Sequence, residues 1–261
     1  MTPTSRIYLT RHAQAEHNVH GDNSIVDAPL TDLGILQAER MPALTPEVQD
    51  AVDLVVTSPL KRTLQTTALA YAPAIERLGG MKKVVCLPQL QGSSREELEA
   101  LEYYARFDLS ALTPDWIGKA GVYAVDEEAL SARAQWLRQY LRGRPEQHIV
   151  VVAHGDFLRR IAEQPDTPWG NAQIRLYEFD PALVETDACP LMQVQDVTPG
   201  NWVDGDVAAN GMADPLANME ERVKQIQASV ASQSNELEEL DRRLEEAERK
   251  KTELEAQVLD N

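Results

Sequence analysis

Two arginines and two histidines in this chain have the types and settings needed for chemistry on an anion. Arg11 and His12 follow one short apolar run, Arg62 follows a second and His154 follows a third. A guanidinium presents a planar fork of donors that matches phosphate oxygens, and it stays charged at physiological pH. Nearby positive charge lowers the pKa of an imidazole, which keeps a ring nitrogen nucleophilic near neutral pH. The four residues are therefore suited to phosphoryl transfer.

His12 is the expected nucleophile of such a reaction. A neutral His12 would attack phosphorus in line and form a phosphohistidine, which water then hydrolyses. Arg11, Arg62 and His154 would neutralise the equatorial oxygens, so we expect neither a metal ion nor another cofactor. The expected substrate is a small, anionic, phosphorylated metabolite.

The elements that must position these residues are those of an α/β fold. Short β-rich runs alternate with segments of helical periodicity, which favours a three-layer sandwich with a mainly parallel central sheet. Strands are expected over 6–10, 53–57, 84–87, 148–153 and 173–179, and helices from about 33, over 60–70, 94–104 and 126–141, and after 156. Residues just past the carboxyl ends of the strands converge on one crevice in such a sheet. The four residues are therefore expected to share a pocket.

The segments that hold these residues follow one another in a familiar order. They are Arg11-His12 with Asn18, Ser58-Pro59-Leu60 with Arg62 and Gln65-Thr66, and His154-Gly155. Together they resemble the histidine phosphatase superfamily, whose best-known branch is the cofactor-dependent phosphoglycerate mutases. The resemblance spans residues 6 to about 179, and segments 27–34 and 169–175 are similar to a fungal-type subgroup. It implies a phosphoglycerate mutase-like fold with His12 as the phosphorylated residue. Arg11, Arg62 and His154 would then form the phosphate pocket, and Asn18 would be a substrate-side ligand.

One position departs from the family pattern. The family places a glutamate after the third strand, where it protonates the leaving oxygen, but Gly92 occupies the matching position here. Without that acid, a mutase reaction is less expected than hydrolysis of activated esters. Glu96 and Glu97 could replace the acid or could simply be helix N-terminal carboxylates. Asp156 could replace it, bind substrate or cap a helix.

The other histidines and a group of aromatic residues leave alternatives open. His17 and His20 could line the pocket mouth or lie on the surface, and His148 is expected to be structural. Aromatic residues between the third and fourth strands could form apolar walls of the pocket or ordinary core. These are Tyr103, Tyr104, Phe107 and Trp116.

The distribution of charge divides the chain into three parts. Lys+Arg total 25 and Asp+Glu 42, a formal net charge of −17. Residues 1–179 form the expected catalytic domain, and residues 180–215, with seven acids and no base, an acidic flexible linker. Residues 216–261 contain a repeat of apolar residues at alternating spacings of three and four, which predicts a coiled-coil helix. We expect residues 219–258 to pair as a homodimer or with a partner helix.

Composition also limits the partners and the location of the protein. A surface this acidic repels the phosphate backbone of a nucleic acid. Nucleic acid is therefore not an expected partner. The two cysteines, Cys86 and Cys189, form no disulfide framework, and the longest apolar run is far shorter than a bilayer-spanning helix. We expect no membrane association and a cytoplasmic location.

Three hypotheses for the function follow. The first is a phosphomonoesterase acting through His12 with an atypical or missing acid. The second is a repurposed isomerase, dehydratase or cyclase, in which His12 or His154 is the base and Arg11 or Arg62 stabilises an oxyanion. The third is a non-catalytic module that binds a phosphorylated ligand and reports through its coiled coil.

Overall fold

The centre of the fold is a six-stranded sheet in which five strands run in one direction. The computed structural model describes residues 4–20, 25, 27–88, 95–112, 123–198 and 200. The strands are β1 (Arg6–Arg11), β2 (Leu54–Thr57), β3 (Val85–Cys86), β4 (His148–Ala153), β5 (Ile174–Phe179) and β6 (Leu191–Thr198). Their order is β3-β2-β4-β1-β5-β6, and β5 is antiparallel to both of its neighbours. The mainly parallel sheet and its first five strands are thus confirmed.

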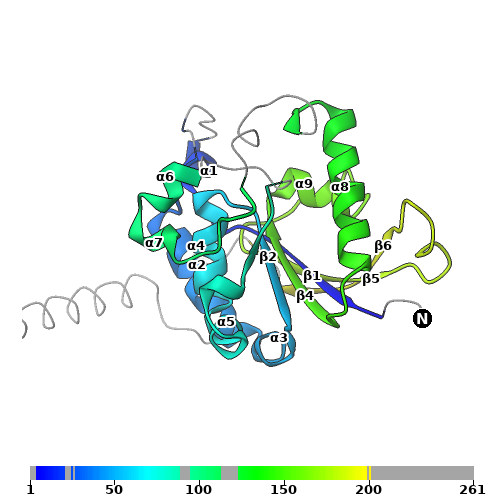
Figure 1. Ribbon diagram of the computed structural model, residues 1–261, viewed down its shortest axis with the longest axis horizontal. Helices are drawn as coiled ribbons and strands as arrows, with labels where there is room; N and C mark the ends of the chain where they lie inside the picture. The colour runs from blue at the N-terminus through cyan, green and yellow to red at the C-terminus, as the bar shows by residue number, and fades with distance from the viewer. Residues whose placement is uncertain are drawn as a thin grey trace, which may run out of the picture. The chain divides into compact units, whose positions relative to one another are not determined.

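Helices cover both faces of this sheet (Figure 1). One face carries α2 (Asp32–Leu44), α4 (Lys61–Ala70) and α5 (Ala72–Leu78), and the other carries α8 (Glu127–Arg142) and α9 (Gly155–Ile161). Shorter helices are α1 (Glu16–His20), α3 (Pro46–Ala51), η1 (Met81–Lys83), α6 (Arg95–Glu99) and α7 (Glu102–Ala105). The helix expected over 94–104 is therefore two short helices. Three layers result, as the sequence predicts.

Alternation along the central strands divides the core between these two faces. Tyr8 packs into one cluster with residues of α2 and α4, whereas Ile7 and Leu9 pack into a second cluster with residues of α8 and α9. Successive side chains of a strand point to opposite faces, so a strand whose middle residues are all buried, as those of β1 are, belongs in the middle of a three-layer fold. The position of β1 between β4 and β5 agrees with this pattern.

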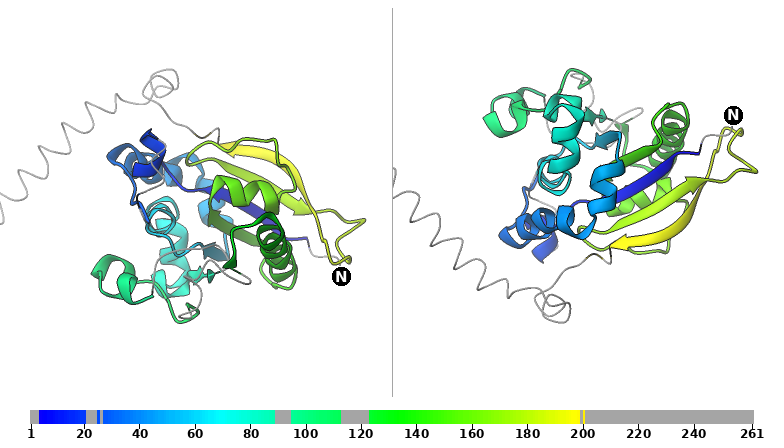
Figure 2. Two further views of the ribbon diagram at one scale, coloured as in Figure 1. Left: turned by 90° about the horizontal axis from the view of Figure 1, so that it is seen from above. Right: turned by 90° about the horizontal axis from the view of Figure 1, so that it is seen from below.

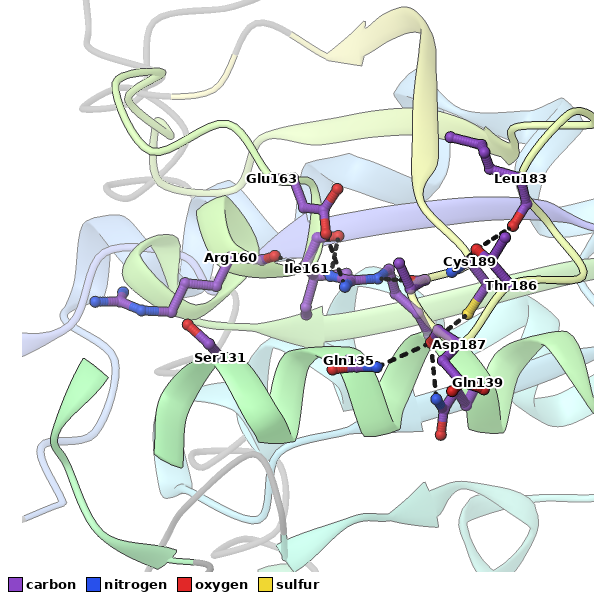
Figure 3. A network of polar contacts seen from close by, with 12 residues as sticks. Ser131, Gln135, Gln139, Arg160, Ile161, Glu163, Leu183, Thr186, Asp187 and Cys189 are labelled. Carbon is purple, nitrogen blue, oxygen red and sulfur yellow. Dashed lines mark hydrogen bonds and ion pairs between the residues drawn. The ribbon is translucent and has the colours of Figure 1, made fainter. Parts of the chain in front are cut away.

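The first part of the expected linker, residues 180–198, is folded, and the prediction of flexibility there is wrong. β6 pairs with β5 at the edge of the sheet (Figure 2), and the first compact unit of the chain covers residues 1–202. Side chains of α8 hold the loop before β6 through its carbonyl groups (Figure 3). Arg138 donates to the carbonyl of Ala188 at 2.8 Å and Gln139 to that of Asp187 at 2.7 Å. The expected coiled coil, 216–261, lies outside the described residues.

None of the helices in the described part of the chain combines the length and the apolar character that a bilayer crossing requires.

Candidate active site

The four residues singled out by the sequence meet at a cavity of about 400 Å³. Arg11 ends β1, His12 and His154 follow β1 and β4, and Arg62 lies in the first turn of α4. The backbone N–H of His12 donates to the carbonyl of Ala153 at 3.0 Å, which joins the two strand ends. Residues that line the cavity are Arg11, His12, His17, Asn18, Arg62, His154, Gly155, Asp156, Arg159, Pro168 and Trp169. All six predicted site residues are in this set.

One nitrogen of the His12 ring is fixed by the backbone. Nδ1 lies 2.7 Å from the carbonyl oxygen of Ala13, to which it can only donate. Because Nδ1 carries the proton of the neutral ring, Nε2 carries the lone pair. Burial, Arg62 and Arg11 hold the pKa of His12 well below its usual range. His12 is therefore neutral near pH 7, with an unprotonated Nε2.

His154 lies beside His12, with 5.3 Å between the ring centroids. Its Nε2 lies 3.0 Å from the Ser58 hydroxyl, while its Nδ1 is buried without a hydrogen-bond partner among the described residues. Burial and then the charge of Arg62 lower the pKa of His154 well below its usual range. A neutral ring at this position has one nitrogen left for a ligand.

Arg11 and Arg62, the two arginines that the sequence predicted here, bring positive charge to the cavity. Arg11 donates to the carbonyl of Trp169, and its Nε, like that of Arg62, is buried without a hydrogen-bond partner among the described residues. Burial lowers the pKa of Arg62 to about 10, despite the opposing effect of Asp27. Both guanidinium groups are nevertheless charged at neutral pH. Donors left unpaired in a buried site are costly unless a ligand accepts from them.

Asn18 and Asp156 line the cavity but are engaged with protein groups. The Asn18 side-chain oxygen accepts from the Ala15 N–H at 3.0 Å. The Asp156 carboxylate pairs with Arg159 at 2.7 Å and also with Arg160. Asp156 is in the first turn of α9, whose N-cap is His154, so the capping alternative for Asp156 is wrong.

Two of the three proposed replacements for the family acid do not reach this cavity, and the third is held in ion pairs. Glu96 and Glu97 lie exposed in the first turn of α6, and neither lines the cavity, which favours the helix-terminus alternative. The position of Gly92 lies outside the described residues. Asp156 is the only carboxylate among the described lining residues, and its pKa is lowered by hydrogen bonds from Arg160 and Arg159 against the effect of burial. A carboxylate held ionised in this way is poorly suited to donate a proton.

Of the two remaining histidines whose side chains are described, one lines the cavity and the other is half-buried at the start of β4. His17 lines the cavity, which settles its alternatives in favour of the pocket. His148 begins β4, at the far end of the strand from His154, and its Nδ1 lies 3.3 Å from the Tyr8 hydroxyl, a structural position as expected. His20 ends α1, and its side chain lies outside the described residues.

None of the described aromatic candidates from the sequence lines the cavity. Tyr104 and Phe107 are buried in a core cluster rather than in the cavity wall, and Tyr103 is partly exposed. The side chain of Trp116 lies outside the described residues. The core alternative therefore holds for the two buried residues.

Arg159 and Trp169 are lining residues to which the sequence alone gave no role. Arg159 is in the last turn of α9, and Trp169 is in the loop between α9 and β5. Arg175 stacks over the Trp169 ring at 4.1 Å and thereby helps to fix the carbonyl that orients Arg11. Their positions follow from the path of α9 across the ends of the strands. One signal in the sequence could have indicated this side of the cavity: two arginines, Arg159 and Arg160, follow His154 within six residues.

Comparisons with known proteins agree with this geometry. The family model of the histidine phosphatase superfamily (branch 1) matches residues 7–184. "Phosphoglycerate mutase-like protein 1" of Arabidopsis thaliana is 29% identical over 194 residues, which cover 58% of this chain and 68% of that protein. A Schizosaccharomyces pombe protein named as a probable phosphatase is 28% identical over 166 residues, 59% of this chain and 75% of that protein.

A solved structure supports the fold as well. A structure from Escherichia coli assigned to an α-ribazole-5′-phosphate phosphatase has a TM-score of 0.50 at 18% identity, and the match covers 76% of this chain and all of that one. The fungal-type subgroup suggested by the sequence stays a prediction. The family model matches more than half of the chain. The chain therefore belongs to the histidine phosphatase superfamily (branch 1) and is an enzyme of the histidine phosphatase type.

Proposed function

We propose that this protein is a metal-independent phosphomonoesterase that hydrolyses a small phosphorylated metabolite through a phosphohistidine on His12. The observation that carries the proposal is the state of the His12 ring. Nδ1 donates to the Ala13 carbonyl, so the unprotonated Nε2 is left free in a cavity with unpaired cationic donors. A nucleophile and a phosphate-binding group are thus combined in one site.

The reaction proceeds in two displacements at phosphorus. Nε2 of His12 attacks, the Nε2–P bond forms, and the P–O bond to the leaving group breaks with its electron pair on the leaving oxygen. Water then attacks phosphorus, the Nε2–P bond returns its electron pair to Nε2, and the protons of water stay with inorganic phosphate and its solvent. Arg11, Arg62 and His154 stabilise the equatorial oxygens in both steps.

The leaving oxygen receives little help in this site. Gly92 stands where the resemblance implies a glutamate, and Asp156 is paired with two arginines. General acid catalysis contributes about 10² to 10⁴ in rate. Esters with acidic leaving groups are therefore the preferred substrates, and alkyl phosphates are hydrolysed slowly. The cavity, about 400 Å³, is of the size that holds a small metabolite.

Hydrolysis of p-nitrophenyl phosphate beside an alkyl phosphate tests this proposal. The wild type is expected to hydrolyse the aryl ester, His12→Ala to lose this activity, and Gly92→Glu to gain activity on the alkyl ester. Absence of His12-dependent release from both esters would refute the phosphatase and favour the repurposed enzyme, for which metabolites with a carbonyl group are the next substrates to screen.

The C-terminal segment is proposed to pair as a coiled coil over residues 219–258. The support is the apolar repeat in the sequence, which exceeds five heptads. Light scattering on the full chain and on a chain ending at residue 215 tests this. A change from dimer mass to monomer mass is expected, and an unchanged mass would contradict it.

A further inference from the structure

A third histidine, His17, lies in the cavity beside the proposed nucleophile. Its ring lines the same cavity as His12, and the ring centroids lie 5.6 Å apart. The phosphatase mechanism described above gives this residue no role. The ring is nevertheless held in a defined orientation by its neighbours.

Neighbouring amides fix which His17 nitrogen carries the proton. The Asn18 side-chain oxygen accepts from the backbone N–H of Ala15 at 3.0 Å and from the Asn171 amide at 3.2 Å, so the Asn18 amide cannot be turned round. Its Nδ2 therefore faces Nε2 of His17, at 3.0 Å. An amide nitrogen only donates, so Nε2 must accept, and the neutral ring carries its proton on Nδ1.

The Nδ1 atom of His17 is a donor without an acceptor. It is buried, and it has no hydrogen-bond partner among the described residues. Burial, followed by the charges of Arg62 and Arg11, lowers the pKa of His17 to about 4, which agrees with a neutral ring. His12 and His17 thus have opposite roles in adjacent rings, one with a free lone pair and the other with a free N–H.

We propose that His17 is a catalytic residue that donates a hydrogen bond from Nδ1 to an equatorial oxygen of the phosphoryl group transferred to His12. This inference rests on the proposed phosphatase function and extends it. No proton is transferred: the Nε2–P bond of His12 forms and the bond to the leaving group breaks as described above, while the N–H of His17 stays in place. A neutral donor already oriented before the reaction needs no reorganisation when charge develops on the oxygen.

The position of His17 favours an equatorial oxygen over the leaving oxygen. In line attack places the leaving oxygen on the far side of a phosphorus atom that itself lies about 3 Å from Nε2. The His17 ring centroid lies 5.6 Å from that of His12, and the His154 ring centroid lies 5.3 Å from it. His17 is therefore beside the nucleophile, as His154 is. His17 therefore does not replace the acid that is missing at Gly92.

Two substitutions at position 17 test the proposal. His17→Leu removes the donor, whereas His17→Asn places an amide N–H near the position of Nδ1. We expect His17→Leu to lower kcat/KM for p-nitrophenyl phosphate about 10- to 100-fold, the usual effect of losing one donor to a charged oxygen. Inhibition by vanadate, which adopts the geometry of the transition state, should weaken by a similar factor. His17→Asn should recover part of both losses. His148→Asn, at the far end of β4, is the control and should match the wild type.

The choice of substrate separates an equatorial contact from other roles. Phenyl phosphate has a more basic leaving group than p-nitrophenyl phosphate, and an equatorial donor should matter equally for both. A loss in His17→Leu that grows markedly with the basicity of the leaving group would overturn the proposal by placing His17 at the leaving oxygen. Equal vanadate affinity in His17→Leu and the wild type would also overturn it.

Failure of the parent proposal gives a different result. A wild type with no His12-dependent hydrolysis refutes the phosphatase itself. Active wild type with an unaffected His17→Leu refutes only the role of His17. Unfolding midpoints of all variants show whether a loss comes from the site or from the fold.

Discussion

Replacing Gly34 with alanine should destabilise the fold from a position next to the active-site loop. A Cβ added at Gly34 would lie 1.9 Å from the carbonyl oxygen of Gln14, two residues after His12. That carbonyl cannot easily move, because it accepts from the Thr31 N–H at 3.0 Å and lies 3.3 Å from the Thr31 hydroxyl. Ordinary contacts between heavy atoms need about 3.5 Å, so helix α2 and the loop must separate by roughly 1.5 Å.

The expected free-energy change follows from two opposing contributions. Overpacking against a fixed backbone group costs about 3 kcal/mol, and alanine returns about 1 kcal/mol through its helix propensity. The net loss in the free energy of unfolding is about 2 kcal/mol, or roughly 4 to 8 °C in Tm for a domain of this size. Because Gln14 follows the nucleophile closely, kcat/KM for p-nitrophenyl phosphate should fall as well.

Urea unfolding measures this loss, with Gly143→Ala as the matched control. A Cβ at Gly143 would meet its nearest neighbours at 3.5 and 3.6 Å, and the backbone there is in the right-handed helical region. The control should therefore lie within about 0.5 kcal/mol of the wild type. A Gly34→Ala protein as stable as the control would refute the reasoning, because the close contact between α2 and the Gln14 carbonyl would then not exist in solution.

Three further perturbations have defined outcomes. Arg62→Leu should lower kcat/KM about 100-fold or more. It should also move the acidic limb of the pH profile towards pH 6.5, because the charge of Arg62 helps to lower the pKa of His12; an unmoved limb would contradict this. His12 and His154 are neutral in the folded state with pKa values below the unfolded value of about 6.5, so the unfolded chain binds more protons below that pH. The stability that these two rings contribute is fully present above pH 6.5 and is lost as the pH falls towards the folded pKa values. Urea midpoints measured from pH 7.5 to 5 will show this loss, and the midpoint should depend less steeply on pH in His154→Asn. Arg138→Met should cost about 1 to 3 kcal/mol in urea unfolding, since it removes the donor from the carbonyls of Ala188 and Ile161. A change below about 0.5 kcal/mol would refute the structural role of these contacts.

The central strands could be predicted from the sequence because their signal is local. β4 has the bounds expected, 148–153, because a short uninterrupted apolar run flanked by polar residues is typical of a buried strand. β6 was missed because its side chains are mostly exposed between buried ends, which is typical of an edge strand and leaves no periodic pattern. The arginines of α8 that hold the preceding loop act on carbonyl groups, and such contacts leave no pattern in the sequence of the loop.

The site was predictable to the extent that its residues follow strand ends. Arg11, His12 and His154 come directly at or after the ends of β1 and β4, so the topology alone brings them together. Arg159 and Trp169 reach the cavity only through the path of α9 and the loop after it, which the sequence does not reveal. The tautomers of the rings likewise depend on which amide and carbonyl groups the fold brings beside them.

Trapping the covalent intermediate tests the central claim most directly. The full chain is mixed with ³²P-labelled p-nitrophenyl phosphate, quenched in alkali within the first turnovers, and digested for mass spectrometry. We predict phosphate on His12, stable to alkali and released by acid, and no label in His12→Asn. Turnover of the ester by the wild type without any label on His12, or with the label on another residue, would contradict the account.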